Sequence, residues 1–398
     1  MHLKSINIKN LRVFRETSIE LPPVDPDRKF SNVYLFLGTN GSGKTSLLRA
    51  IAMTAIAAVL PSSGMRPYSL VRRVGSTRPG CVLRADFALA AQDGKAKALK
   101  SEVRIDAMRG FNDKFGKVTF PKTHEAELWD DGSPAFFVVG YGASRLPEPQ
   151  GSSQSENTRG RSLRYQRVAG LFEEFVPLRP LRSWLLNYKN KGRHSQVVTL
   201  INKLLEDVDV KLIPKPVDDE YLFEMNGALL PLSALSDGYR AYIGWISDLL
   251  YHVCLGCPPG KMLWENCGIV LIDEVDLHLH PQWQRVVIER LSATLPNLQF
   301  FFTTHSPLVA GSLPSANTFV VRTADSKAGA KAEPSELDIY GWSVDQILNS
   351  SLFAETPSRN SQAIQAIEAA SARARRGDRD AAMELMAVLA DGVKSPLK

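Results

Sequence analysis

The chain has 398 residues and a mass of 44.0 kDa, which is enough for two or three domains of ordinary size. Hydrophobic residues make up 44% and charged residues 23%, which excludes a chain that is disordered as a whole. No apolar run reaches the roughly 18–20 residues that span a bilayer, and the N-terminal residues lack the apolar stretch of a signal peptide. We therefore expect a cytoplasmic protein with no membrane partner. The net charge of +6 weakly favours a polyanionic partner.

The four cysteines are too few to indicate a disulfide framework. Cys254 and Cys257 have the spacing of half a zinc site, and Cys267 could supply a third ligand. No second pair of cysteines or histidines follows at zinc-finger spacing. The sequence therefore favours the alternative, a short loop of small and apolar residues.

The first 60 residues predict strands, a tight loop and a helix. Residues 5–8 and 17–21 alternate between apolar and polar as half-buried strands do. Residues 33–37 form a continuous apolar run, which is typical of a strand covered on both faces. A helical pattern then runs over 44–60 and stops at Pro61.

The middle of the chain alternates between short strands, turns and helices. Asn226-Gly227 is a strong signal for a tight turn between two strands. The elements expected here are strands at 81–88, 100–105, 117–120 and 136–141, a mobile loop at 150–162, helices within 163–207 and a strand pair within 211–230.

The last third of the chain predicts two more buried strands with an amphipathic helix between them. The expected elements are a helix at 235–255, strands at 269–272 and 300–303 around a helix at 281–294, a strand at 318–322, and helices at 361–376 and 380–391.

Residues 38–45, Gly-Thr-Asn-Gly-Ser-Gly-Lys-Thr, match the phosphate-binding pattern G-x-x-x-x-G-K-[ST] in full. The glycines let backbone N–H groups turn toward phosphate oxygens, and the following helix points its positive dipole end at the same anion. Lys44 is expected to reach the β- and γ-phosphates, and the Thr45 hydroxyl to bind Mg²⁺. The predicted nucleotide-binding residues, with ATP and Mg²⁺ as ligands, are Asn40, Gly41, Ser42, Gly43, Lys44, Thr45 and Ser46.

Two later strands also end in polar residues. The apolar strand at 269–272 is followed by Asp273 and Glu274, and the strand at 300–303 by Thr304 and His305. Because the carboxyl ends of parallel strands line one crevice, these side chains should meet at the phosphate loop. Asp273 would then lie beside the metal, and Glu274 would polarise the attacking water. The predicted catalytic residues are Glu274, His305 and Lys44, and the predicted magnesium ligands are Thr45 and Asp273.

The order of these motifs resembles that of ABC-type ATPases: a phosphate loop, then Leu-Ser-Asp-Gly at 235–238, then the acidic pair and the histidine. The resemblance implies that Ser236, Asp237 and Gly238 act in trans on ATP held by another protomer, in a homodimer or higher oligomer closed around ATP. It also implies that Asp276 lies in the loop that senses the partner. Tyr239 stands where the family often has Gln.

Finer features are similar to the OLD-, RecF- and SMC-like class of these ATPases. The opening at 1–14 looks like that class. Asp-Glu-Val-Asp-Leu-His-Leu-His-Pro at 273–281, Thr-Thr-His-Ser-Pro at 303–307 and the segment at 165–172 resemble ATP-binding subunits of Septu-type and retron-associated anti-phage systems. His278 and His280 also allow a metal-site interpretation, although the resemblance places them in the inter-subunit loop.

The resemblance implies an α/β P-loop NTPase fold of the ABC-ATPase type, a mixed sheet flanked by helices with an antiparallel β part and a helical lobe. We expect 1–145 and 231–345 to form the ATPase head, 146–230 to be a helical lobe insertion, and 346–398 to be a C-terminal helical segment. The absence of sustained heptads excludes long coiled-coil arms. With 84 residues after 314 and no acidic cluster for two metals, we expect no nuclease domain in cis.

We therefore expect a Mg²⁺-dependent ATPase that controls a separate effector, expected to be a nuclease, in anti-phage defence. The alternative is a RecF-like DNA repair ATPase that binds DNA directly. A transporter ATPase and an ATP-binding scaffold are further rivals, and the basic insertions argue against the transporter. Arg12 is the candidate for an adenine contact.

The basic residues are concentrated in two segments. Residues 61–124 have 13 Lys/Arg against 5 Asp/Glu, and nine basic residues lie within 159–193. They could bind nucleic acid phosphates without base specificity, or they could be ordinary solvated surface.

Overall fold

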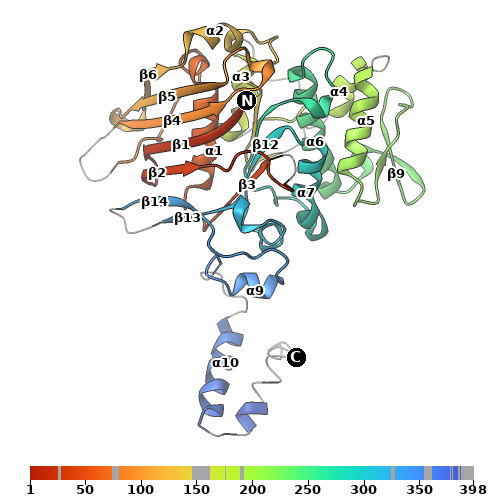
Figure 1. Ribbon diagram of the computed structural model, residues 1–398. Coiled ribbons are helices and arrows are strands. Elements are labelled where there is room, and N and C mark those ends of the chain that lie inside the picture. The colour runs from red at the N-terminus through yellow and green to blue at the C-terminus, as the bar shows by residue number, and fades with distance from the viewer. Residues whose placement is uncertain are drawn as a thin grey trace. The chain divides into compact units, whose positions relative to one another are not determined.

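A computed structural model describes residues 1–25, 28–73, 80–145, 162–174, 176–188, 192–323, 328–353, 361–376, 378, 380–383 and 386. The chain forms two compact units, Met1–Gly341 and Trp342–Lys398. All the sheets that the structure describes lie in the first unit, which Figure 1 shows with its strands and helices labelled. The loop expected at 150–162 lies outside the described residues, apart from Ser162.

The central layer of the first unit is a six-stranded mixed sheet with the order β14-β13-β3-β12-β11-β7. Every residue of β3, β11 and β12 is buried, because helices and a second sheet cover both faces. All its pairs are parallel except β13–β14. The strands are β3 (Val33–Leu37), β7 (Val138–Tyr141), β11 (Gly268–Ile272), β12 (Leu298–Thr303), β13 (Thr318–Thr323) and β14 (Ala330–Pro334).

A five-stranded antiparallel sheet with the order β2-β1-β4-β5-β6 lies beside it. Burial in β4 alternates along the strand, so one face packs on the core and the other meets solvent. The strands are β1 (His2–Leu11), β2 (Phe14–Glu20), β4 (Cys81–Ala88), β5 (Ala98–Asp106) and β6 (Lys114–Thr119). The mixed sheet and this antiparallel part confirm the expected fold class.

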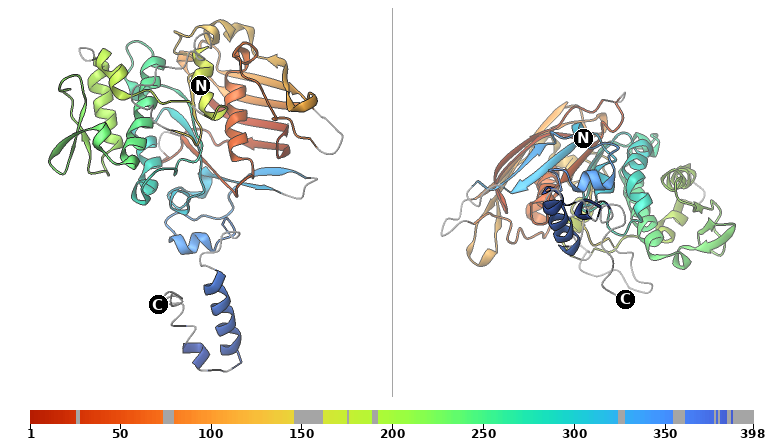
Figure 2. Two further views of the ribbon diagram at one scale, coloured as in Figure 1. Left: turned by 180° about the vertical axis from the view of Figure 1, so that it is seen from behind. Right: turned by 90° about the horizontal axis from the view of Figure 1, so that it is seen from below.

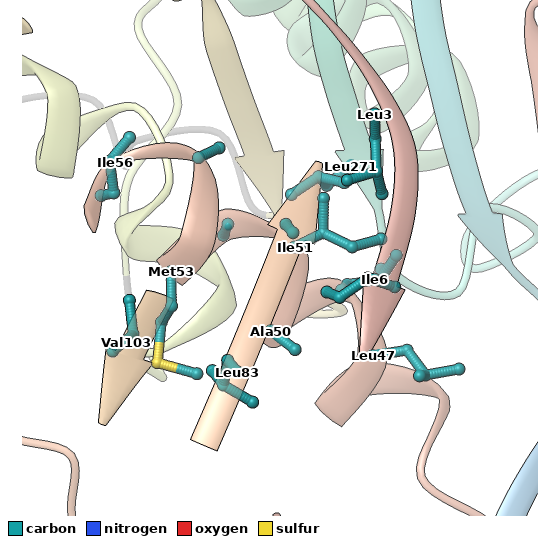
Figure 3. Close-up of a cluster of buried hydrophobic side chains, with 14 of the residues drawn as sticks. Leu3, Ile6, Leu47, Ala50, Ile51, Met53, Ile56, Leu83, Val103 and Leu271 are labelled. Atoms are coloured by element: carbon teal, nitrogen blue, oxygen red, sulfur yellow. The ribbon is translucent and has the colours of Figure 1, made fainter. Parts of the chain in front are cut away.

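Helix α1 (Lys44–Ala55) is the centre of the core, because it packs between the two sheets. Figure 3 shows Ile51 of α1 among side chains from both, including Ile6 of β1 and Leu271 of β11. Burying each such side chain contributes about 1.5–3 kcal/mol to folding. The expected helix over 44–60 is too long: α1 ends at Ala55, and a 3₁₀ helix at Ala57–Ser62 contains Pro61, whose nitrogen cannot donate an α-helical hydrogen bond.

Most of the remaining helices lie at the opposite end of the first unit from β5 and β6 (Figures 1 and 2). A three-stranded sheet, β10-β9-β8, accompanies them, and Asn226 and Gly227 both have positive φ at its tight turn, as predicted. The remaining α-helices and strands of the first unit, at either end, are α2 (Lys122–Trp129), α3 (Leu163–Gln166), α4 (Leu181–Leu185), α5 (Gly192–Leu204), β8 (Lys211–Leu212), β9 (Leu222–Met225), β10 (Ala228–Pro231), α6 (Asp237–Gly256), α7 (Pro281–Thr294) and α8 (Pro307–Ala310). Helices α5, α6 and α7 pack together, and Arg290 of α7 pairs with Glu206 and Asp207.

The second unit contains α9 (Val344–Leu348) and α10 (Ser361–Ala374). Ser343 and Gln346 form a reciprocal capping box at the start of α9. The helix expected at 380–391 lies largely outside the described residues. In the described part of the chain, no helix is both long enough and apolar enough to cross a bilayer.

Candidate nucleotide-binding site

Strands β3, β12 and β11 are parallel neighbours, so their carboxyl ends lie at one edge of the mixed sheet. In register, Ile272 lies opposite Phe302, and Phe36 lies opposite Thr303. The phosphate loop, the acidic pair and His305 each follow one of these strands. The fold therefore brings together the three motifs that the sequence predicted to meet there.

The phosphate loop needs glycine at two positions because its neighbours come very close. A Cβ on Gly38 would lie 2.4 Å from the carbonyl oxygen of Val321, and one on Gly43 would lie 2.6 Å from the ring of Phe14. Gly43 also has φ of 113°, which side-chain-bearing residues rarely adopt. Helix α1 begins directly after it, so its free backbone N–H groups face the loop.

Lys44 folds back over the phosphate loop. Its Nζ donates hydrogen bonds to the carbonyl oxygens of Gly38 (2.8 Å) and Thr39 (3.1 Å). Burial lowers the pKa of Lys44 to about 8, although the nearby carboxylates of Asp273 and Glu274 oppose the shift. The ammonium is thus held where nucleotide phosphates would both bind and stabilise it.

Asp273 joins the phosphate loop to two strands. Its Oδ2 accepts a hydrogen bond from Thr45 Oγ1 at 2.7 Å, and its Oδ1 accepts one from Thr303 Oγ1 at 2.5 Å. A hydroxyl and a carboxylate side by side are the hard oxygen donors that Mg²⁺ prefers. These residues fit a magnesium ion shared with nucleotide phosphates.

Glu274 follows Asp273 in a strained backbone conformation, with φ of 48°. Its backbone N–H donates to Thr303 Oγ1 at 2.7 Å, so one threonine fixes both members of the acidic pair. Burial raises the pKa of the half-buried Glu274 carboxyl, as do Asp273 and Asp276, while Lys44 opposes the shift. A raised pKa brings a carboxylate closer to the range suited to a general base at neutral pH.

Arg145 is a site residue that the sequence analysis did not identify. It is 3% exposed, and its guanidinium donates to the carbonyl oxygens of Gly142 (3.1 Å), Asp273 and Glu274 (2.7 Å). Burial lowers the pKa of Arg145 to about 10, although the acidic residues of the site oppose the shift. In the sequence, Arg145 was marked only by its place after β7, the strand that pairs with β11. Its contacts to Asp273 and Glu274 are to backbone carbonyls 128 and 129 positions away, which no local pattern reveals.

The residues after β12 connect the site to the loop that follows the acidic pair. The Thr304 hydroxyl donates to the Asp276 carboxylate, and Thr304 Oγ1 accepts from Ser306 N–H at 2.9 Å. His305 between them is half-buried, and burial together with Lys44 lowers its pKa. A neutral imidazole at this edge can accept or donate a hydrogen bond.

The predicted signature residues lie at the start of α6. Ser236 is the N-cap, but its side chain makes no capping hydrogen bond, and both Ser236 and Asp237 are exposed. Asp237 pairs with Arg240 one turn further along the helix. Within the described residues, neither Ser236 nor Asp237 hydrogen-bonds to the phosphate loop of its own chain.

The two alternative metal sites have other contacts in the structure. His280 caps α7 by accepting Gln282 N–H at its Nδ1 (3.4 Å), and Cys257 Sγ donates to the carbonyl of Met262 (3.4 Å). Among the residues described, no group of three or more His, Cys, Asp and Glu side chains is placed to hold a metal ion.

The parallel sheet, the phosphate loop and the acidic pair define an α/β P-loop NTPase fold of the ABC-ATPase type, and the chain resembles the OLD-, RecF- and SMC-like class of these ATPases. Two family models match the chain: one described as "AAA ATPase domain" at residues 1–57, and one described as "AAA domain, putative AbiEii toxin, Type IV TA system" at residues 141–311. A solved SMC head bound to the C-terminal winged-helix domain of ScpA has a similar fold, with a TM-score of 0.52, 13% identity, and coverage of 85% of this chain and 99% of that one.

Curated relatives include Septu proteins and probable ATPases of retrons, which confirms the finer resemblance. The Septu protein PtuA of Bacillus mycoides (strain KBAB4) is 26% identical over 88% of this chain and 44% of its own length. The "Retron Vc95 probable ATPase" of Vibrio cholerae serotype O1 biovar El Tor is 36% identical over 31% of this chain and 24% of its own. The chain therefore spans less than half the length of either relative.

Proposed function

We propose that this protein binds and hydrolyses Mg²⁺-ATP as a head-to-tail dimer and thereby controls a separate effector in anti-phage defence. The observation that carries the proposal is the chain of hydrogen bonds Thr45–Asp273–Thr303. It fixes the hydroxyl and carboxylate oxygens beside the phosphate loop. Such preorganised oxygens are what a magnesium nucleotide requires.

Each residue of the site has a role in this proposal. Lys44 exchanges its loop carbonyls for β- and γ-phosphate oxygens, and Glu274 accepts a proton from the attacking water. His305 orients that water or the γ-phosphate. Bound Mg²⁺ would be held by Thr45 and Asp273 and would neutralise the charge on the phosphates.

The dimer is supported by the exposure of the signature segment. Ser236 and Asp237 face solvent beside the N-terminus of a long helix, and their side chains make no hydrogen bond to their own phosphate loop in the described structure. A helix N-terminus favours an anion such as the γ-phosphate. A second protomer can supply that phosphate.

The defence role and the effector rest on the named relatives. Both are components of the Septu or retron systems, and we infer that this chain likewise governs a partner, expected to be a nuclease. Cells that express this protein together with the proposed effector should lose protection against phage when Glu274 is changed to Gln. Undiminished protection would contradict this part of the proposal.

The alternative of direct DNA binding is less favoured by the structure. In the segment with the local basic excess, Arg84 and Arg104 both pair with Glu102 at 2.6 Å, and Arg73 pairs with Asp113. Arg164 is buried and donates to backbone carbonyls such as that of Ser133 (2.9 Å). ATP-dependent binding of DNA by the purified protein alone would reverse this preference.

The Glu274→Gln variant tests the ATPase proposal. It keeps the shape of the side chain and removes the base, so turnover should fall at least about 100-fold while ATP still binds. Bound ATP should then persist and hold the dimer together. If the wild-type protein neither binds ATP nor changes its assembly state with ATP, the proposal is wrong.

A further inference from the structure

The signature segment and the loop after the acidic pair lie against each other within one protomer. A Cβ built on Gly238 would lie 3.5 Å from the carbonyl oxygen of His278 and 3.8 Å from the ring of Trp283, which is ordinary van der Waals contact. The first turn of α6 therefore rests directly on this loop and on the first turn of α7.

Trp283 is the side chain that these two elements share. Its ring contacts Tyr239 edge-on at 4.6 Å between centroids, stacks on Tyr242 at 5.7 Å, and meets the ring of His280 at 6.1 Å. Trp283 is 6% exposed, so the contacts are desolvated. Aromatic pairs in such geometries stabilise the contact beyond what their buried area contributes.

Both sides of the tryptophan are themselves fixed. Tyr242 is buried, and its hydroxyl donates to the carbonyl of Leu204 at the end of α5 (3.1 Å). The loop is closed by backbone hydrogen bonds, including Leu279 N–H to the Asp276 carbonyl at 3.1 Å, and Gln284 Nε2 donates to the Leu279 carbonyl at 3.0 Å. Trp283 thus connects two segments that are each held by further hydrogen bonds.

We propose that Trp283 is a positioning residue that holds the signature segment 236–238 and the loop 276–280 as one rigid face for the partner's ATP. This proposal rests on the head-to-tail dimer of the proposed function. It also gives a role to Tyr239, whose ring packs edge-on against Trp283. Trp283 would then act on the partner's site and not on its own.

Mixing of variants tests this direction of action. Trp283→Ala should reduce turnover about 10- to 100-fold, since misplacement by about 1 Å suffices for that, and Trp283→Phe should restore most of it. The Trp283→Ala protomer keeps its own phosphate loop and Glu274. Mixed with Lys44→Ala, which keeps an intact signature segment, the Trp283→Ala protomer should recover activity. The recovery should equal that of the reference mixture, Lys44→Ala with Ser236→Arg. Mixed with Ser236→Arg, the Trp283→Ala protomer should recover none.

The opposite pattern, recovery with Ser236→Arg and none with Lys44→Ala, would overturn the proposal. A reference mixture that recovers nothing would instead contradict the dimer of the proposed function.

Trp184→Ala is the matched control, because Trp184 is equally buried but packs on Tyr188 and Tyr251, away from the signature. If Trp283→Ala fails to fold, the half-buried Tyr239→Ala must show the same mixing pattern, and its failure to do so overturns the proposal.

Discussion

Two regions of the first unit are built differently: the phosphate loop with its acidic pair, here called the first edge, and the start of α6, called the second edge. At the phosphate loop, the main side chains already have partners within the chain: Lys44 on loop carbonyls, and Asp273 on Thr45 and Thr303. At the start of α6, Ser236 and Asp237 are exposed, whereas Gly238 packs on the loop after the acidic pair and on Trp283. In the proposed function, the first edge is complete in one molecule, whereas the second acts on ATP held by another molecule.

Changing Asp273 to Asn should impair the first edge most strongly. Asparagine keeps the shape but loses the charge that holds the two threonine hydroxyls and suits Mg²⁺. We expect turnover to fall about 10²- to 10³-fold, an effect as large as the loss of an electrostatic group at a reaction centre. Steady-state ATPase assays over a Mg²⁺ titration measure this, with Asp237→Asn as the comparison at the second edge, where we expect a smaller loss. Equal losses in the two variants would contradict the distinction between the edges.

Arg145 should show that the first edge depends on internal contacts. Arg145→Met removes the guanidinium and leaves the carbonyls of Asp273 and Glu274 without their donor, at a cost of about 1–3 kcal/mol of unfolding free energy. The strained backbone of Glu274 would relax, so kcat should fall about tenfold or more with little change in KM. Urea unfolding and steady-state kinetics check both effects. A change confined to KM would show that Arg145 acts in ATP binding instead.

The neighbouring threonines offer a matched pair. Thr303→Val removes the hydroxyl that fixes Asp273 and Glu274, whereas Thr304→Val removes the one that holds Asp276, in the loop that the proposed dimer places at the partner. We expect Thr303→Val to lower kcat about tenfold without weakening the dimer, and Thr304→Val to weaken the ATP-dependent dimer by a smaller factor. Sedimentation of each variant in the Glu274→Gln background separates the two outcomes. Identical behaviour of the pair would remove the proposed division of roles.

The smallest expected effect is the alkaline limb of the pH profile. Because burial lowers the pKa of Lys44 to about 8, the free protein loses the ammonium as the pH rises through that value. Phosphates favour the charged form, so the pKa rises again when ATP binds. We therefore expect kcat/KM to fall severalfold above about pH 8 while kcat stays level. A flat kcat/KM profile up to about pH 9.5 would contradict this assignment.

Local patterns in the sequence predicted much of this arrangement. The apolar runs identified β3, β11 and β12, the phosphate-loop motif marked the start of α1, and α7 has the predicted bounds of 281–294. The acidic pair and His305 follow strands that pair in parallel, so their convergence could be predicted from the strand ends alone.

The long-range contacts were not predictable in the same way. Arg145 recognises backbone carbonyls, which any sequence supplies, and Trp283 is indistinguishable by pattern from an ordinary buried position on an amphipathic helix. The hydrogen bond from Thr304 to Asp276 likewise depends on the conformation of the loop, in which Glu274 and His278 have positive φ. Such contacts join segments that only the tertiary fold brings together.

In the proposed dimer, the signature of one protomer completes the ATP site of another. Sedimentation of Glu274→Gln and of the double variant Glu274→Gln/Ser236→Arg with Mg²⁺-ATP tests this arrangement. We predict that the single variant doubles its mass from 44.0 kDa while the double variant binds ATP but stays monomeric. A double variant that dimerises as well as the single one would contradict the claim.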